Sequence, residues 1–228
     1  VIQLHKGDTA EVSALALLGS NQTQLDSGVK FLQQGLLLAE KLGYKKGEAD
    51  CLIRLAQKIS DRGQAIQYCL DALRIFEELK DAEGVAASHL VLQWTYRESG
   101  DYKNSLIHAF KGEQKAEADN VIGLRTFPGS RLAPLFLAEI GGTYLLKNQL
   151  DSASFFTQQS IEQNELFNGA AWNFPVYLLA TIQSMQGNYE LALKNYRKAN
   201  SLAIQNGFEM DTLQIQSGMS TLFLRTGQ

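Results

Sequence analysis

One pattern of small residues recurs about every 40 residues and constrains the fold more than any other feature of the chain. In its clearest copy, Gly187-Asn188-Tyr189 is followed by Ala192, Tyr196 and Ala199. Four weaker copies keep the same offsets: Gly28, Leu32 and Gly35; Ala65, Cys69 and Ala72; Ser105, Ala109 and Gly112; Ala153, Thr157 and Ser160. A fixed period of this size predicts a solenoid, because each unit can bury its apolar face only against its neighbours.

The residues around each copy have the periodicity of an amphipathic helix. From Tyr189 to Ala203, apolar side chains recur every three or four positions, as the 3.6-residue helical period requires. Ser99-Gly100-Asp101 and Gln186-Gly187-Asn188 lie between such stretches, where glycine can end one helix and Asp or Asn can cap the next. We therefore expect an all-α fold, a right-handed α–α superhelix of about five helical hairpins plus one terminal helix.

The repeat pattern predicts a single domain over residues 1–228. Its expected units are 7–46, 47–83, 84–123, 131–169, 170–208 and a partial unit 209–228. The interval between the third and fourth copies is the longest, which places extra residues in a connection near 121–131. Gly227 occupies the position that Gly187 has one unit earlier, so we expect this chain to be a fragment of a larger protein.

Composition argues against several classes of function. The net charge is −3 and the charged residues, 20% of the chain, mix both signs, whereas a general nucleic-acid binder needs a concentrated basic surface. No apolar run approaches the roughly 18 to 20 residues that cross a bilayer. We expect neither nucleic-acid binding nor membrane insertion. A soluble, cytoplasmic protein is favoured, with a periplasmic location left open if the chain belongs to a membrane sensor.

The residues that carry enzyme chemistry form no recognisable motif. The three histidines, His5, His89 and His108, belong to no triad or metal-ligand spacing, and no glycine-rich phosphate loop is present. Cys51 and Cys69 are expected to pack as small apolar side chains in one helical pair, and a disulfide between them is left open. We expect no catalytic residue, no cofactor and no metal ion in this fragment.

The repeat resembles the tetratricopeptide repeat family. Ile140-Gly141 with Tyr144 matches the family's first helix, and Gly187, Tyr189, Ala192, Tyr196 and Ala199 match its turn and second helix. The units are longer than the family's usual length of about 34 residues. Longer units of this kind resemble those of bacterial signalling proteins, where the array precedes a kinase, cyclase or DNA-binding domain, and they also resemble eukaryotic scaffold arrays.

In this family the first helix of each unit lines a concave groove, so the resemblance implies groove positions in this chain. The principal candidates are Arg54, Lys58, Leu90, Trp94, Arg97, Tyr177, Thr181 and Arg225, with Gln57, Glu98, Ala138, Gly142, Leu145, Leu146, Phe174, Ser184, Met185, Ser217, Thr221 and Leu224 beside them. The cations near Trp94 would hold an acidic segment or a C-terminal carboxylate, and Trp94 and Tyr177 would be apolar anchors. The alternative is that Trp94 packs between helices and the cations are simply solvated.

These observations predict a non-catalytic domain that binds a protein or peptide segment, the sensory or regulatory part of a bacterial signalling protein. The alternative is a structural or dimerisation scaffold, in which Met219, Phe223 and Leu224 bury against a second copy or a missing helix. Light scattering at several concentrations separates the two. An enzyme or small-molecule binder would instead need an enclosed polar pocket.

Overall fold

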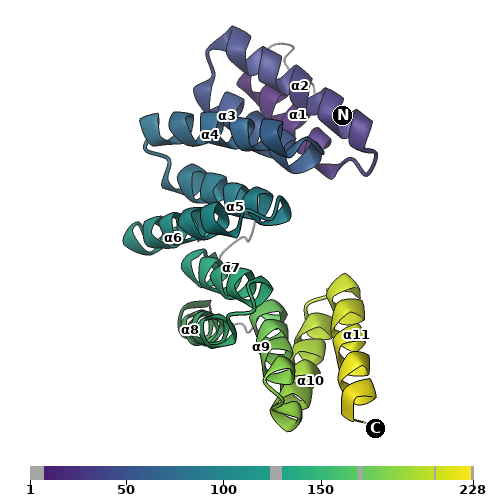
Figure 1. The fold of residues 1–228 in the computed structure, drawn as a ribbon. Coiled ribbons are helices and arrows are strands. Elements are labelled where there is room, and N and C mark those ends of the chain that lie inside the picture. Colours follow the sequence, from purple (N-terminus) through teal and green to yellow (C-terminus); the bar gives the residue numbers. More distant parts are fainter. Residues whose placement is uncertain (1–7, 124–129, 169–171, 208, 227–228) are drawn as a thin grey trace. The chain divides into compact units, whose positions relative to one another are not determined.

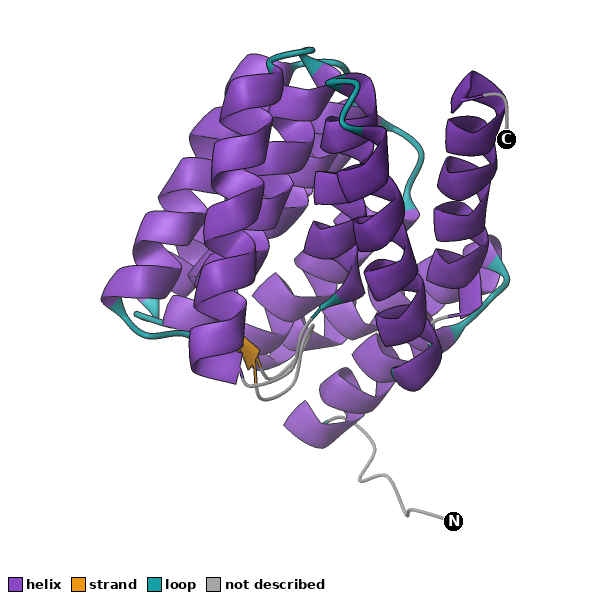
Figure 2. Ribbon diagram, turned by 90° about the horizontal axis from the view of Figure 1, so that it is seen from below, coloured by secondary structure: helices purple, strands orange, loops and turns teal. Residues whose placement is uncertain are grey.

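The computed structural model describes residues 8–123, 130–168, 172–207 and 209–226, and these fold almost entirely into helices (Figures 1 and 2). The helices are α1 (Thr9–Asn21), α2 (Leu25–Leu42), α3 (Lys45–Lys58), α4 (Arg62–Glu78), α5 (Ala82–Glu98), α6 (Tyr102–Ala118), α7 (Ala133–Leu146), α8 (Leu150–Asn168), α9 (Asn173–Met185), α10 (Tyr189–Gln205) and α11 (Glu209–Thr226). Within the described residues they form five hairpins of consecutive helices, α1/α2 to α9/α10, followed by α11. The expected all-α solenoid class is confirmed.

A small antiparallel ladder interrupts the helices in the long connection. Strand β1 (Ile122–Gly123) pairs with β2 (Ser130–Arg131), and Ile122 lies opposite Arg131. The sequence pattern placed extra residues here but did not predict strands. Residues 124–129 of this connection lie outside the described part of the chain.

The chain divides into two compact units, Val1–Lys115 and Ala116–Gln228, each with its own buried clusters. In the first unit, Phe76 and Leu92 belong to a cluster shared by α3, α4 and α5. In the second, Val176, Tyr196 and Ile215 bring α9, α10 and α11 together. The cores therefore run from hairpin to hairpin inside each unit, as expected of repeats that bury their apolar faces against one another.

The small repeat positions lie where paired helices meet. All fifteen of them, three in each second helix, are buried. In α7, a methyl group added to Gly141 would lie 2.4 Å from the Thr157 hydroxyl and 3.1 Å from the Ala153 carbonyl oxygen, and both of these residues are repeat positions of α8. The two helix backbones therefore approach too closely for any side chain at residue 141.

The turn residues act largely as their types predict. Asp61 and Asp101 cap α4 and α6, because their carboxylates accept hydrogen bonds from the amides of Gln64 and Asn104, each at 3.0 Å. Gly100 and Gly187 adopt left-handed backbone angles at the ends of α5 and α9. Asn188, however, makes no side-chain cap to α10.

Two histidines that are distant in sequence meet inside the first unit. The Nδ1 atoms of His89 on α5 and His108 on α6 lie 3.1 Å apart, and the His108 ring stacks on Tyr96 with centroids 5.4 Å apart. Burial, with a smaller contribution from His108 and Lys111, lowers the pKa of His89 to about 4. Burial and Lys111 also lower the pKa of His108. The pair is therefore neutral near pH 7.

Cys51 and Cys69 are free thiols buried in the first unit, and their disulfide is absent. Burial raises the pKa of each to about 12, so neither thiol ionises at neutral pH.

Across the described segments, none of the helices combines the length and the apolar character needed to cross a membrane.

The neutral His89 should make the first unit sensitive to acid. In the unfolded chain His89 takes up a proton near pH 6.5, whereas in the folded chain it does so only near pH 4. Its stabilising contribution is therefore complete above pH 6.5 and is lost as the pH falls towards 4, about 2 kcal/mol of it by pH 5. We expect His89→Gln to reduce the loss of stability between pH 7.5 and 5, measured by urea unfolding. An unchanged pH dependence in this variant would contradict the assignment.

The close approach at Gly141 can be tested with a matched glycine. Gly141→Ala should destabilise the chain by about 1–3 kcal/mol, because the added methyl group overlaps α8. Gly63, in the first turn of α4, has only the Asp61 carboxylate within 4 Å of an added methyl group, at 3.3 Å. Gly63→Ala should be neutral or stabilising by up to about 1 kcal/mol. Equal losses in urea unfolding would rule out helix contact as the cause.

Candidate functional site

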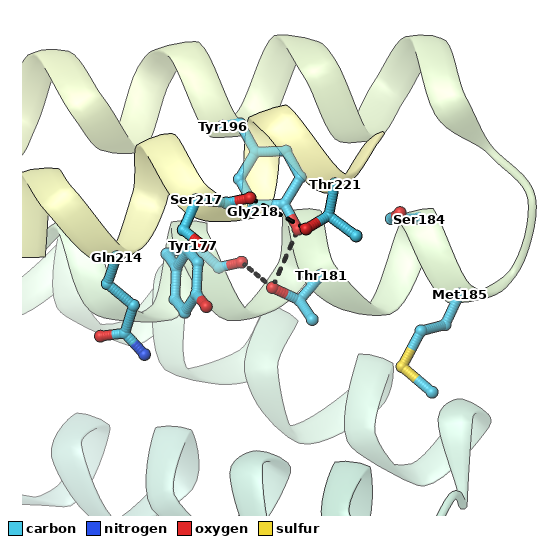
Figure 3. A pocket seen from close by; sticks show the side chains of 9 residues that line it. All are labelled: Tyr177, Thr181, Ser184, Met185, Tyr196, Gln214, Ser217, Gly218 and Thr221. Atoms are coloured by element: carbon cyan, nitrogen blue, oxygen red, sulfur yellow. Dashed lines mark hydrogen bonds between the residues drawn. The ribbon is translucent and has the colours of Figure 1, made fainter. Parts of the chain in front are cut away.

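A cavity of about 390 Å³ lies in the second unit, bordered by α9, α10 and α11 (Figure 3). It is lined by Tyr177, Thr181, Ser184, Met185, Tyr196, Gln214, Ser217, Gly218 and Thr221. Eight of these nine residues come from α9 and α11, the first helices of two consecutive hairpin positions, and Tyr196 comes from α10 between them. A volume in this range is typical of sites that hold small molecules or a few residues of a peptide.

Helical spacing explains why these side chains share one space. On α9, Val176 and Ala180 are buried against α10, which leaves Tyr177 and Thr181, one position further along, on the adjoining face. On α11, Ile215 and Leu222 are buried in the same cluster. Gln214, Ser217, Gly218 and Thr221 therefore form a stripe beside that buried edge and border the cavity.

Tyr196 links the interior to the cavity. It is a repeat position of α10, 3% exposed, and its ring centroid lies 5.9 Å from that of Tyr177. Its hydroxyl is 3.2 Å from the Thr181 hydroxyl, which itself donates to the Tyr177 carbonyl at 3.0 Å. Because the single Thr181 proton is engaged with that carbonyl, Tyr196 is the donor to Thr181. These bonds hold Thr181 in one orientation at the cavity wall.

Two further contacts fix α11 beside α9 and α10. A methyl group added to Gly218 would lie 2.9 Å from the Tyr196 ring, so α11 can rest on that ring only because residue 218 has no side chain. The buried Asn173 amide donates to the Asp211 carboxylate at 2.7 Å and joins α9 to α11. These two contacts hold together the three helices that border the cavity.

The described residues that line the cavity carry no formal charge. Their polar groups are the hydroxyls of Ser, Thr and Tyr residues and the Gln214 carboxamide, and Tyr177 and Met185 add apolar surface. Throughout the described residues, no three His, Cys, Asp or Glu side chains are grouped so as to hold a metal ion. The chemistry available at the cavity is hydrogen bonding and apolar contact.

Several of the expected groove residues meet at this cavity. Tyr177 and Thr181 line it, as do the neighbouring candidates Ser184, Met185, Ser217 and Thr221. Gln214, Gly218 and Tyr196 also line the cavity, although the repeat pattern did not place them in the groove. Arg225 lies in the last turn of α11, and its side chain lies outside the described residues.

The candidates in the first unit are engaged differently. Arg54 on α3 donates to the Ser20 hydroxyl at 2.6 Å, and Lys58 donates to the Gln22 carbonyl at 3.0 Å, just past the end of α1. Both cations therefore stabilise the C-terminal end of α1, where the helix dipole favours positive charge. Trp94 packs, half-buried, against the cluster of α3, α4 and α5, and Arg97 is half-buried in the last turn of α5.

The assignments of Leu90 and Ala138 to a groove surface are wrong. Leu90 is 2% exposed, and Ala138 on α7 is 0% exposed. Ten of the seventeen residues of α5 are buried, so the helix is covered around most of its circumference. A face chosen by helical spacing alone can then lie against protein and not against solvent.

The sequence matches no protein-family model and no curated protein. Its structure resembles solved structures of low sequence identity. The apo form of RapI has a TM-score of 0.72 and 16% identity, with 94% of this chain and 84% of RapI covered. A Rap protein in complex with competence and sporulation factor has a TM-score of 0.74 and 13% identity, with 91% and 57% covered. NprR with its cognate peptide NprX has a TM-score of 0.66 and 18% identity, with 90% and 59% covered.

These likenesses show the fold. The chain has the helical-repeat architecture of tetratricopeptide-like proteins, as the repeat pattern predicted. It spans little more than half the length of the peptide-bound Rap protein and NprR.

The bond from Tyr196 to Thr181 can be tested by removing one oxygen atom. Tyr196→Phe keeps the buried ring but loses the hydrogen bond, so we expect a loss of about 1 kcal/mol in the free energy of unfolding. Tyr189, at the start of α10, is 40% exposed and lies outside the cavity, and Tyr189→Phe should change stability by less than about 0.5 kcal/mol. Equal effects of the two substitutions in urea unfolding would count against this role.

Proposed function

We propose that this chain is a non-catalytic repeat domain that binds a peptide segment at the cavity of α9, α10 and α11. The observation that carries the proposal is the alignment of α9 and α11, whose adjoining faces present hydroxyl, amide and apolar groups to one space. A peptide needs this combination, because its backbone requires hydrogen-bond partners and its apolar side chains gain from burial.

The similar structures support this choice of ligand. The solved Rap protein holds competence and sporulation factor, and the solved NprR holds its cognate peptide NprX. We propose by analogy that the present chain is the sensory or regulatory part of a bacterial signalling protein, of the longer-repeat type, and that it acts in the cytoplasm. A single repeat domain over residues 1–228, linked to an output domain elsewhere in a larger protein, is part of the same proposal.

The candidates of the first unit remain predictions. To bind a ligand carboxylate, Arg54 and Lys58 would have to give up their hydrogen bonds to the end of α1. Each of these bonds has a charged donor, so its loss costs free energy. Trp94 and Arg97 remain accessible in part and could extend a binding surface in that unit. The neutral cavity of the second unit needs no such exchange of ion contacts.

A self-associating scaffold is the second candidate. On α11, Leu213 and Leu224 are 62% and 84% exposed, and exposed leucines on one helix favour burial against another chain. The measured molar mass in light scattering, with and without a bound peptide, separates this function from peptide binding by a monomer.

The peptide proposal is tested by filling the cavity. A phage-displayed random heptapeptide library is selected on the wild-type chain, and enriched peptides are synthesised with a fluorophore for anisotropy titrations. Ser217→Trp places an indole in the cavity and should weaken binding by about 10-fold or more. Ser220→Trp, an exposed α11 position outside the cavity, should leave the affinity within about 2-fold of wild type.

Circular dichroism confirms that both variants are folded before binding is compared. If Ser217→Trp and Ser220→Trp bind every enriched peptide alike, the cavity is not the binding site. If no peptide is enriched over a column without the protein, the proposal of a peptide ligand fails.

A further inference from the structure

We infer that the segment held in this cavity is uncharged, an extended stretch of aliphatic and hydroxyl- or amide-bearing residues without Asp, Glu, Lys or Arg. The inference rests on the proposed function and narrows its ligand. It departs from the acidic or carboxylate segment that the cations of the first unit suggested.

The composition of the lining carries the first step. None of its nine residues has a formal charge, and the buried side that faces them is the apolar cluster around Val176 and Ile215. A charged ligand group in contact with these nine side chains would meet no opposite charge among them. Burial of an unpaired charge is strongly unfavourable, whereas burial of an amide or hydroxyl that finds a partner is nearly neutral.

The first helices of the second unit, α7 and α9, also carry little charge. Helix α9 contains no charged residue, and the only one in α7, Glu139, is 6% exposed and so is directed into the protein. On α11, the charged residues Glu209, Asp211 and Arg225 stand in the first and last turns, and Asp211 is bonded to Asn173. The described α11 residues that line the cavity, from Gln214 to Thr221, are uncharged.

Charge content varies widely among the first helices of the hairpins: α1 and α7 contain one charged residue each, α5 contains three and α9 contains none. Helix α3 has the same place in its hairpin as α9 and contains six charged residues: Lys45, Lys46, Glu48, Asp50, Arg54 and Lys58. The repeat therefore tolerates charge in its first helices and does not require it. An uncharged α9 is compatible with a site for a neutral ligand.

The polar groups of the lining match a peptide backbone. The Gln214 carboxamide offers both a donor and an acceptor, which pair with the carbonyl and amide of one peptide unit. The Ser217 hydroxyl stands one turn further along α11. The Thr221 hydroxyl, another turn along, donates to the Ser217 carbonyl at 3.0 Å and therefore offers an acceptor. Across the cavity, the Tyr177 ring and the Met185 thioether offer contact to an aliphatic side chain (Figure 3).

Introduced charges at Ser217 test the inference. The same heptapeptide library is selected on wild type, Ser217→Asp and Ser217→Lys, with Ser220→Asp and Ser220→Lys as matched controls outside the cavity. Among the peptides selected on wild type, adjacent positions should contain charged residues at a frequency at least about 3-fold lower than in the unselected library. Ser217→Asp should enrich Lys and Arg there, and Ser217→Lys should enrich Asp and Glu, whereas the Ser220 variants should select as wild type does.

The outcomes separate this inference from the proposed function. The neutral-ligand inference would be overturned by peptides that bind wild type, lose binding in Ser217→Trp and carry charged residues at every position as often as the unselected library. Peptide binding at the cavity would still stand. Selected peptides that bind Ser217→Trp as tightly as wild type would overturn the proposed site, and the inference with it.

Discussion

Close contact between paired helices at small residues is the constraint on which the rest of this structure depends. At Gly141 the backbone of α7 lies against the side chain of Thr157, and at Gly218 the backbone of α11 lies against the ring of Tyr196. Such contacts fix the spacing of neighbouring helices far more narrowly than a layer of flexible side chains would. The faces that remain uncovered are thereby held at defined separations.

The candidate site follows from that spacing. Tyr196 fills the interior between α9, α10 and α11, and the same side chain delivers a hydroxyl to Thr181 at the cavity wall. Packing and site chemistry thus share one residue. Because the core holds Tyr196 and Thr181 in place, a ligand would not have to order these two side chains, which lowers one of the usual costs of association. The uncharged side chains of the described lining favour recognition by shape and hydrogen bonds over recognition by charge.

The sequence alone was sufficient for the fold because the small positions recur at constant offsets, and a helical period projects them onto one side. The same projection found Tyr177, Thr181, Ser217 and Thr221, which lie on uncovered faces. It failed for Leu90, because α5 is covered on most sides by neighbours that spacing within α5 cannot reveal. Gly218 has no side chain that could mark it as a site residue, and the repeat pattern assigned Tyr196 to helix packing alone. The contact of His89 with His108 depends on the register between α5 and α6, which only the folded structure supplies.

The most direct test is an NMR titration that follows the methyl resonances of the methionines as a peptide binds. The chain has three methionines, of which Met185 lines the cavity and Met219 packs in the adjoining apolar cluster. With methyl-labelled methionine and one enriched heptapeptide, the Met185 resonance should shift on titration with the dissociation constant found by anisotropy, and the Met219 resonance should move much less. A saturating peptide that leaves Met185 unmoved would contradict binding at this cavity.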